Sequence, residues 1–302
     1  MHIESFIERH RLAPDFWRTA RDIYIPLARW VDEALKKHSR GTFVLGINGA
    51  QGTGKSTLSE FLAEYLAAEL GRSTAVLSLD DLYLTRAERQ ALARTVHPLL
   101  ATRGVPGTHD VGLGIRVLDA LRALGAGEQL ALPRFDKAVD DRRSVAEWPV
   151  VRGAVELVIF EGWCVCSEAV PDAELDQPVN ALEAAEDSDG AWRRFVNEQL
   201  ASVYPALFSR VDALVFLAAP GFDAIRRWRF EQERKLIANI GNQTKQTMDG
   251  AGIERFVRHF ERVTRQDLER LPCRADVVLE LGSDHTVTAV RYRSSPESGA
   301  IP

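Results

Sequence analysis

The sequence predicts a doubly wound α/β fold, in which helices cover both faces of a parallel sheet. Five short runs are rich in Val, Leu, Ile or Phe and lack clean alternation, which is typical of strands buried on both faces. Helical patterns separate these runs, and a glycine-rich segment follows the first of them. The predicted strands are residues 43–47, 75–79, 156–160, 213–217 and 275–281.

The clearest helical pattern begins directly after the glycine-rich segment. Its apolar residues recur at helical spacing and therefore form one continuous face. Gly71 follows the last of them, and a glycine at this position commonly ends a helix. The face consists of Leu58, Phe61, Leu62, Tyr65, Leu66 and Leu70.

Length and composition indicate a globular protein. The 302 residues are 45% hydrophobic and 27% charged, and we expect a single domain over residues 1–302. The net charge of −5 argues against a nucleic-acid partner, because no overall basic field exists to bind a phosphate backbone. The expected parts are a helical appendage (1–40, with helix over 16–37), a core (43–281), an exposed acidic excursion (171–190) and a frayed tail (294–302).

We expect a cytoplasmic protein with no membrane partner. The longest apolar run, residues 213–219, is too short to span a bilayer, and charged residues interrupt the N-terminus where a secretory signal would lie. An odd, sparse set of cysteines indicates a reducing compartment. Cys164 and Cys166 stand one residue apart, but no second pair of ligands accompanies them, so we expect no metal site there.

The most specific motif is a phosphate-binding loop. Residues 49–56 match G-x-x-x-x-G-K-[ST] at every fixed position, between a predicted strand and a predicted helix. Glycines let backbone N–H groups point at phosphate oxygens, and the following helix adds its positive end. Lys55 is expected to reach the β- and γ-phosphates, and the Ser56 hydroxyl is expected to bind Mg²⁺. The expected nucleotide-binding residues are Gly49, Ala50, Gln51, Gly52, Thr53, Gly54, Lys55, Ser56 and Thr57.

Acidic residues follow two of the predicted strands, at the edge of the sheet where the loop lies. Glu161 ends the strand over 156–160, and a second ligand of Mg²⁺ is expected at this position. Asp80 and Asp81 end the strand over 75–79, and one of them can accept a proton from a substrate hydroxyl. Because adjacent acids can also cap a helix or bind a metal, these roles stay open for either residue.

Two basic clusters follow the fourth predicted strand. Arg226, Arg227 and Arg229 lie in a helical pattern, and such a cluster can supply a lid that stabilises charge on a transferring phosphoryl group. A solvated helix face is the alternative for this cluster. The second cluster, for which a solvated face and a site role are equally open, consists of Arg258, Arg262 and Arg265.

Taken together, these motifs and several later segments make the chain resemble the glycerate kinases of the plant and fungal type. Those enzymes are P-loop kinases, a group that includes uridine kinase, pantothenate kinase and phosphoribulokinase. The resemblance extends over roughly residues 43–281, and the later segments are more specific than the loop, which the whole group shares. The segments are 49–56, 79–85 (LDDLYLT), 103–104 (RG), 107–110 (GTHD), 133–137 (PRFDK), 160–163 (FEGW) and 227–229 (RWR).

The resemblance implies a P-loop NTPase fold with a five-stranded parallel sheet in the order 2-3-1-4-5. It also implies Mg²⁺ with ATP as the phosphate donor and a small hydroxylated acceptor, D-glycerate in that family. Asp80 becomes the expected base, and Arg227 and Arg229 become the lid. Residues 136–137 are followed closely by 141–142, without the longer glycine-containing stretch of the plant-type enzymes, which indicates a bacterial relative. The expected catalytic residues are Lys55, Asp80, Glu161, Arg227 and Arg229.

The expected acceptor site combines groups for a carboxylate with groups for hydroxyls. Arg103, Arg134 or Arg142 can hold a carboxylate bidentately, whereas a nucleoside acceptor would need aromatic surfaces such as Phe135 or Trp163. Three functions stay open: D-glycerate 3-kinase, a kinase for a nucleoside, pantothenate or a sugar, and a nucleotide-dependent switch without an acceptor site. The expected substrate-binding residues are Asp80, Tyr83, Arg103, His109, Asp110, Arg134, Lys137 and Trp163.

Overall fold

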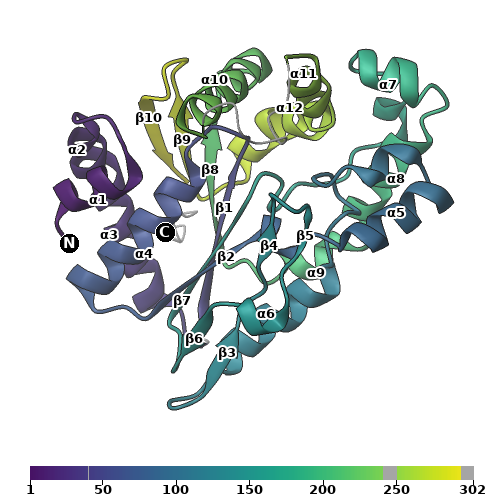
Figure 1. Cartoon of the computed structure of the whole chain (residues 1–302). Helices are drawn as coiled ribbons and strands as arrows, with labels where there is room; N and C mark the ends of the chain where they lie inside the picture. Colours follow the sequence, from purple (N-terminus) through teal and green to yellow (C-terminus); the bar gives the residue numbers. More distant parts are fainter. Residues whose placement is uncertain (40, 241–249, 294–302) are drawn as a thin grey trace, which may run out of the picture.

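A six-stranded, mostly parallel sheet forms the centre of the computed structural model, which describes residues 1–39, 41–240 and 250–293 (Figure 1). From one edge to the other, the strands are β10 (Val287–Tyr292), β9 (Val277–Leu281), β8 (Ala213–Ala218), β1 (Phe43–Gly49), β7 (Leu157–Gly162) and β2 (Thr74–Ser78). All neighbouring strands pair in parallel except β9 and β10. The predicted α/β class with a parallel sheet is therefore confirmed.

The prediction of five strands was one strand short. Each predicted strand occurs within two residues of its expected bounds, but β10 adds an antiparallel strand at the edge of the sheet. The residues of β10 are half-buried or exposed, so this strand lacks the uninterrupted apolar run that marks the interior strands. An edge strand that packs on only one side carries a weaker signal in the sequence.

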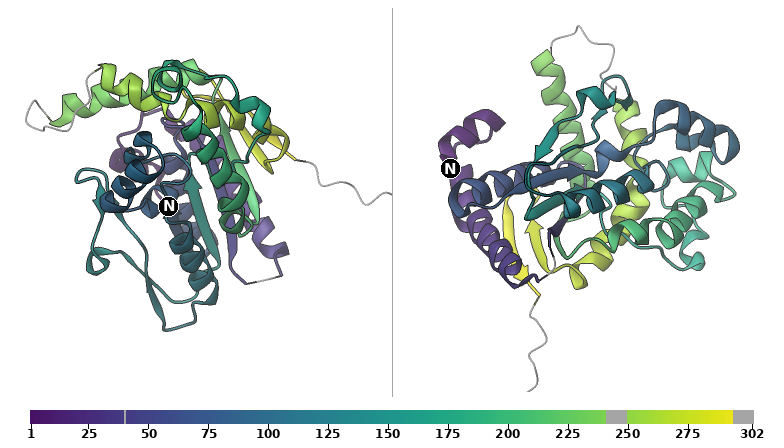
Figure 2. Two further views of the ribbon diagram at one scale, coloured as in Figure 1. Left: turned by 90° about the vertical axis from the view of Figure 1, so that its right-hand side faces the viewer. Right: turned by 90° about the horizontal axis from the view of Figure 1, so that it is seen from below.

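Helices cover both faces of the sheet (Figure 2). On one face, Leu58 of α4 (Lys55–Leu70) belongs to the same buried cluster as Ile47 of β1. On the other face, Leu118 of α6 (Val111–Ala123) belongs to a cluster with Val44 of β1. The side chains of β1 thus alternate between two cores, as expected for a strand covered on both sides. Helix α4 ends where predicted, at Gly71, whose φ of 66° lies in the left-handed region.

The other elements extend these layers. The helical run predicted over residues 16–37 is present, with a π-helical segment (Ala20–Tyr24) between two α-helices. The remaining helices are α1 (Ile3–His10), α2 (Phe16–Thr19), α3 (Ile25–Lys37), α5 (Arg86–Thr95), α7 (Ala181–Glu186), α8 (Ala191–Ser202), α9 (Tyr204–Phe208), α10 (Phe222–Ile240), α11 (Gly250–Arg258) and α12 (Glu261–Arg270). Two small antiparallel pairs are β3 (Gln129–Ala131) with β6 (Val150–Arg152), and β4 (Phe135–Asp136) with β5 (Asp141–Arg142).

The N-terminal helices pack against α4 through aromatic side chains. Phe6 of α1 is fully buried, and its ring meets the ring of Phe61 edge-on at a centroid distance of 5.4 Å. Tyr24 lies against the same ring at 5.3 Å. These contacts join the first 37 residues to the helix that follows the phosphate loop.

The segment over residues 171–190 is not simply an exposed excursion, as its acidic composition predicted. It contains α7, and Glu183 of that helix is fully buried. Both oxygens of Glu183 bind the guanidinium of Arg262 on α12, at 2.9 and 2.6 Å. Arg262, for which a solvated face and a site role were both open, instead holds this segment against α12. A buried ion pair with two hydrogen bonds can be accommodated where a lone buried acid could not.

The predicted frayed tail, residues 294–302, lies outside the described residues. Among the residues that the structure does describe, no helix combines the length and the hydropathy needed to cross a membrane.

A buried acid beneath the phosphate loop predicts a pH-dependent stability. Asp267 of α12 accepts hydrogen bonds from Ser167 Oγ at 2.6 Å and from Asn48 Nδ2 at 3.3 Å. Burial raises the pKa of Asp267 to about 7, whereas an unfolded aspartate titrates near about 4. The folded state therefore keeps a proton that the unfolded chain releases, and this contribution to stability is lost as the pH rises from about 4 through about 7.

Asp267→Asn should remove this dependence, because an amide keeps the acceptor oxygen and does not titrate. Between pH 5 and pH 7 the free energy of unfolding of the wild type should fall more than that of the variant, by about 1–2 kcal/mol. Urea denaturation of both proteins across this range measures the difference. Parallel pH profiles would show that Asp267 is ionised in the folded protein.

Candidate active site

The phosphate loop joins β1 to α4 and closes tightly on itself. Gly52 has a φ of 82°, and a Cβ at this position would lie 2.9 Å from the Cβ of Trp228. Both the backbone conformation and the close approach therefore require glycine. The hydroxyl of Thr53 is buried and donates to the carbonyl of Ala50 at 2.8 Å, which holds the turn together. Lys55 begins α4, so its side chain projects from the positive end of that helix.

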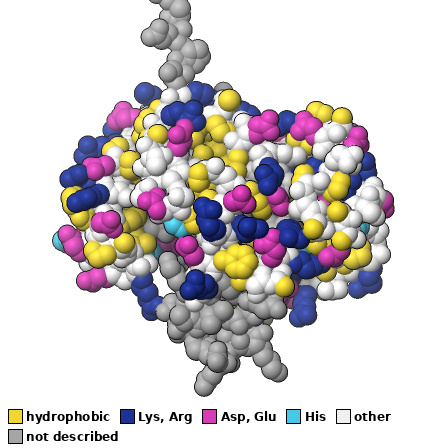
Figure 3. All heavy atoms as spheres, turned by 90° about the horizontal axis from the view of Figure 1, so that it is seen from above, with side chains coloured by type: hydrophobic (Ala, Val, Ile, Leu, Met, Phe, Trp, Pro, Cys, Tyr) yellow, Lys and Arg dark blue, Asp and Glu magenta, His cyan; other side chains and the backbone are white. Residues whose placement is uncertain are grey.

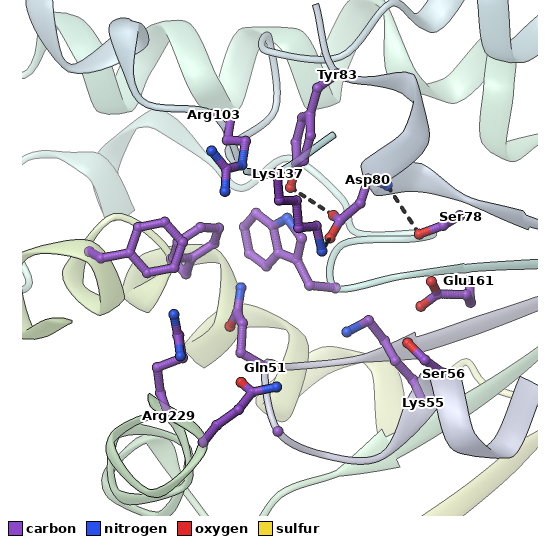
Figure 4. A pocket seen from close by; sticks show the side chains of 15 residues that line it. Gln51, Lys55, Ser56, Ser78, Asp80, Tyr83, Arg103, Lys137, Glu161 and Arg229 are labelled. Carbon is purple, nitrogen blue, oxygen red and sulfur yellow. Dashed lines mark hydrogen bonds and ion pairs between the residues drawn. The ribbon is translucent and has the colours of Figure 1, made fainter. Parts of the chain in front are cut away.

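The residues predicted to bind nucleotide divide into two groups. Gln51, Gly52, Lys55 and Ser56 line a pocket of about 520 Å³ at the end of the sheet (Figure 4). The residues of the loop that do not line this pocket are Gly49, Ala50, Thr53, Gly54 and Thr57. The second group shapes the loop, and its backbone rather than its side chains bears on phosphate binding.

The pocket collects side chains from segments that are far apart in the sequence. In the register of the sheet, Glu161 of β7 lies between Ile47 of β1 and Ser78 of β2. The carboxyl ends of three strands thus meet beside the loop, as predicted for the ligand crevice of an α/β sheet. The pocket is lined by Gln51, Gly52, Lys55, Ser56, Ser78, Asp80, Tyr83, Arg103, Lys137, Glu161, Trp163, Arg229, Gln232, Phe256 and Phe260.

Asp80 points into the pocket from a short 3₁₀ helix, Leu79–Leu82, that follows β2. Its carboxylate accepts hydrogen bonds from Lys137 Nζ at 2.6 Å and from the Tyr83 hydroxyl at 2.7 Å (Figure 4). Burial favours the neutral acid, but the charges of Lys137 and Lys55 outweigh burial and hold the pKa of Asp80 well below its usual range. Asp80 is therefore ionised at neutral pH and can accept a proton.

Asp81 makes a different set of contacts. Its carboxylate accepts hydrogen bonds from Arg134 Nη1 at 2.9 Å and from the backbone N–H of Phe135 at 3.0 Å. Burial raises the pKa of Asp81, in contrast to that of Asp80. The two neighbouring acids, which the sequence left interchangeable, therefore have separate environments, and only Asp80 lines the main pocket.

His109 lies behind the pocket and does not line it, contrary to its expected role as a substrate ligand. Its ring stacks on Tyr83 at a centroid distance of 4.7 Å, and its Nδ1 lies 2.6 Å from the hydroxyl of Tyr204. The N–H of Gly107 donates to the same hydroxyl at 3.0 Å. Burial lowers the pKa of His109 to about 4, so the ring is neutral and supports Tyr83 from behind.

Two further predicted substrate ligands also face away from the main pocket. Asp110 caps α6, because its Oδ1 accepts a hydrogen bond from the N–H of Leu113 at 2.8 Å. Its other oxygen lies 3.5 Å from the guanidinium of Arg142. Arg134 binds Asp81, as described above. The sequence found polar and charged residues near the site, but it could not show that these three lie outside the main pocket.

Arg103 and Trp163 do line the pocket, as predicted for the acceptor site. The guanidinium of Arg103 pairs with Asp140 and lies 5.6 Å from the ring centroid of Phe135. Trp163 is buried, and its Nε1 donates to the carbonyl of Gly104 at 2.8 Å. Phe135, the other aromatic surface available to a nucleoside acceptor, is not among the residues that line this pocket.

The two arginines expected to form a lid separate in the structure. Both lie on α10, but Arg229 lines the main pocket, whereas the exposed Arg227 lines a shallow depression on the other side of the helix with Phe230. The guanidinium of Arg229 lies 5.7 Å from the ring centroid of Phe256. Of the pair, Arg229 is therefore the residue placed to contact a phosphate.

An aromatic wall at the pocket was not predicted. Phe256 and Phe260 line the pocket together with Gln232. The ring of Phe260 meets that of Trp163 edge-on at 4.9 Å. Phe256 lies on α11 and Phe260 directly precedes α12, and their ring centroids are 4.9 Å apart. Nothing local showed that these rings would meet the loop, which is about 200 residues away in the sequence.

Glu161 and Ser56 form a set of oxygen ligands that fits Mg²⁺. Glu161 is only 6% exposed, and its Oε2 has no hydrogen-bond partner among the described residues. Burial raises the pKa of Glu161, and the neighbouring charges of Lys55 and Lys137 offset this effect only in part. Carboxylate and hydroxyl oxygens are ligands that Mg²⁺ prefers, so the donor set and the unpartnered oxygen agree with the predicted metal position.

Glu161→Gln should raise the Mg²⁺ concentration needed for half-maximal activity by about tenfold or more, because an amide binds a hard cation poorly. The thermal midpoint should not fall, since an amide of the same shape costs less to bury than an unpartnered acid. ADP formation measured against Mg²⁺ at fixed ATP gives the answer. An unchanged Mg²⁺ titration would leave Glu161 with a purely structural role.

Neither cysteine beside Glu161 has the environment of a nucleophile. Cys164 is fully buried, and burial raises the pKa of its thiol well above the usual range. Burial likewise raises the pKa of Cys166 to about 12. A thiol that stays protonated is a poor nucleophile and a poor metal ligand, so both residues contribute to packing.

Comparison with known proteins places this chain in a family. No family model matches the chain. The chain is 36% identical over 225 residues to mug58, an uncharacterized kinase of Schizosaccharomyces pombe, and the match covers 72% of this chain and 78% of that protein. It is 31% identical over 226 residues to the chloroplastic D-glycerate 3-kinase of Arabidopsis thaliana, a match that covers 70% of this chain and 47% of that enzyme.

A solved structure shows the same fold. The D-glycerate 3-kinase of Cryptococcus neoformans var. grubii superposes with a TM-score of 0.74 and 22% identity, over 90% of this chain and 99% of that one. The match to mug58 extends over most of both chains, and the shared fold and the complete phosphate loop agree with it. The protein belongs to the family of ATP-dependent P-loop kinases that are similar to D-glycerate 3-kinase.

Proposed function

We propose that this kinase transfers the γ-phosphate of ATP to the 3-hydroxyl of D-glycerate and releases ADP and 3-phosphoglycerate. The observation that carries the proposal is the joining, in one pocket, of the phosphate loop, an ionised Asp80 and two cations for a carboxylate, Arg103 and Lys137. The names of two similar proteins, from Arabidopsis thaliana and Cryptococcus neoformans, support the same acceptor.

The charge of the pocket suits two anionic substrates. On the face seen from above in Figure 3, Lys and Arg side chains lie interspersed with Asp, Glu and hydrophobic ones. Among the residues that line the pocket, four cations stand against the two carboxylates of Asp80 and Glu161. This excess favours ATP and an acceptor that carries its own carboxylate. The cations are Lys55, Arg103, Lys137 and Arg229.

Each residue then has a defined task. Asp80 accepts the proton of the acceptor hydroxyl as its oxygen bonds to the γ-phosphorus and the bond from that phosphorus to the bridging oxygen breaks. Lys55 and Arg229 stabilise the charge that spreads over the phosphoryl oxygens. Mg²⁺ bound with ATP would neutralise phosphate charge, and Ser56 and Glu161 are the residues that would hold it.

The test is ADP release in a coupled assay with D-glycerate, compared with L-glycerate and with no acceptor. Phosphorus NMR of the product distinguishes 3-phosphoglycerate from 2-phosphoglycerate. We expect turnover with D-glycerate and a single product phosphorylated at position 3. Phosphorylation at position 2, or no turnover above the rate without acceptor, would overturn the proposal.

The aromatic wall favours one alternative acceptor class. Phe256 and Phe260 offer ring surface on which a nucleoside base could stack, which D-glycerate does not need. Uridine, cytidine and pantothenate therefore belong in the same assay. A kcat/KM for any of them above that for D-glycerate would assign the acceptor to that compound.

A further inference from the structure

The hairpin that carries Lys137 is too short to hold its own position. Strands β4 and β5 pair through only two positions, Phe135 with Arg142 and Asp136 with Asp141. An isolated two-stranded hairpin is at best marginally stable even when it is longer than this. The place of Lys137 in the pocket therefore depends on what anchors the hairpin to the rest of the protein.

The carboxylate of Asp81 binds the start of this hairpin through both of its oxygens. Asp81 Oδ2 lies 2.9 Å from Arg134 Nη1, and Asp81 Oδ1 accepts the backbone N–H of Phe135 at 3.0 Å. Asp81 is only 7% exposed, and the ring of Phe135 is buried. Contacts to two successive residues fix the direction of the chain as well as its position.

The 3₁₀ helix that carries Asp81 contacts the hairpin a second time, inside the pocket. Asp80 and Asp81 are consecutive, and Asp80 Oδ2 lies 2.6 Å from Lys137 Nζ. The side chain of Lys137 is long and 60% exposed, so ordering it by a single ion pair alone costs side-chain entropy. Because the contacts of Asp81 already hold the hairpin, Lys137 has less conformational entropy left to lose when it pairs with Asp80.

We propose that Asp81 and Arg134 are positioning residues, which hold the hairpin so that Lys137 meets Asp80 in the geometry for phosphoryl transfer. We call this pair of residues the clamp. This inference rests on the roles proposed above for Asp80 and Lys137. The competing role for Arg134 is direct binding of the acceptor carboxylate. That role needs a test, because Arg134 lines a neighbouring cavity of about 340 Å³ that also contains Asp80 and Lys137.

A set of variants separates the two roles. Arg134→Met and Asp81→Asn should each lower kcat with D-glycerate by about tenfold, since small misplacements of reacting groups are costly, and leave the KM for ATP within about twofold. The double variant should be no worse than the worse single variant. Arg134→Met should add no further loss to Lys137→Met, because the clamp acts through Lys137.

The matched control is Arg194→Met on α8. Arg194 is an exposed arginine of similar accessibility (45% against 49% for Arg134) that pairs with Asp176 away from the pocket. We expect it to retain wild-type kinetics. Losses that multiply in the double variant, or a further loss when Arg134→Met is added to Lys137→Met, would overturn the clamp and assign Arg134 to the acceptor.

A second measurement needs no substrate. An ammonium held by a carboxylate stays protonated and reacts slowly with acylating reagents, so freeing Lys137 should speed its acetylation. In Arg134→Met, mass spectrometry after brief treatment with acetic anhydride should show faster labelling at Lys137 and unchanged labelling at Lys36. Unchanged labelling at Lys137 would refute the clamp whatever the acceptor. Faster labelling of Lys137 in Arg134→Met, together with no turnover of D-glycerate by the wild type, would contradict the proposed function and leave the clamp supported.

Discussion

Asp80→Asn should lower phosphorylation of the acceptor by at least about 10²-fold, because a positioned general base typically contributes about 10²–10⁴-fold. Asp80 is ionised by the charges of Lys137 and Lys55 and lies in the pocket with the phosphate loop. An amide of the same shape keeps an acceptor oxygen but cannot take the proton. The affinity for ATP should change little, since the loop holds the phosphates.

Single-turnover transfer and nucleotide titration measure the two effects separately. Asp81→Asn serves as the comparison, and its loss should be smaller, because Asp81 faces the hairpin rather than the main pocket. A more severe loss in Asp81→Asn would assign the role of general base to Asp81 instead of Asp80. Equal, small losses in both variants would show that the pocket does not activate a hydroxyl and would favour a nucleotide-dependent switch.

Lys55→Ala should reduce phosphoryl transfer by at least about 10²-fold, the effect typical of removing one donor that stabilises charge in the transition state. Lys55 stands on the first turn of α4, in the pocket, and no salt bridge among the described residues depends on it. The fold should therefore remain intact. Asp80 should also lose one of the two charges that lower its pKa, so the acid limb of the pH profile should move to higher pH in any residual activity.

Circular dichroism and thermal unfolding check the fold of Lys55→Ala, and coupled ADP release checks transfer. Lys37→Ala, at the exposed end of α3, provides a lysine control remote from the pocket. Turnover like that of the wild type in a folded Lys55→Ala protein would contradict the assignment of the phosphate loop.

The fold class was predictable because each interior strand carries its own evidence. A strand covered on both faces must be apolar along its length, so β1, β7 and β8 stand out in any reading of the sequence. The half-exposed β10 was missed for the same reason. The segment over residues 171–190 was misjudged because its buried Glu183 looks, in the sequence, like any exposed acid.

The functional site was likewise predictable only in part from the sequence. Asp80 and Glu161 could be proposed because they come directly after strands, and the ends of parallel strands meet at one edge whatever else the chain does. The placement of Arg134, Asp110 and His109 could not be foreseen, because each side chain binds another group of the protein. A short polar motif shows which groups are available and does not show which of them remain available to a ligand.

The phosphate loop and the apolar interior strands could be recognised from the sequence alone, since each is marked by residues that stand close together along the chain. The contact of Asp81 with Arg134 and the place of Phe256 at the pocket are set by the packing of the folded protein. These contacts join residues separated by tens to hundreds of positions. An arginine pairs with whichever carboxylate the packing brings within about 3 Å, and that distance is a property of the whole folded core.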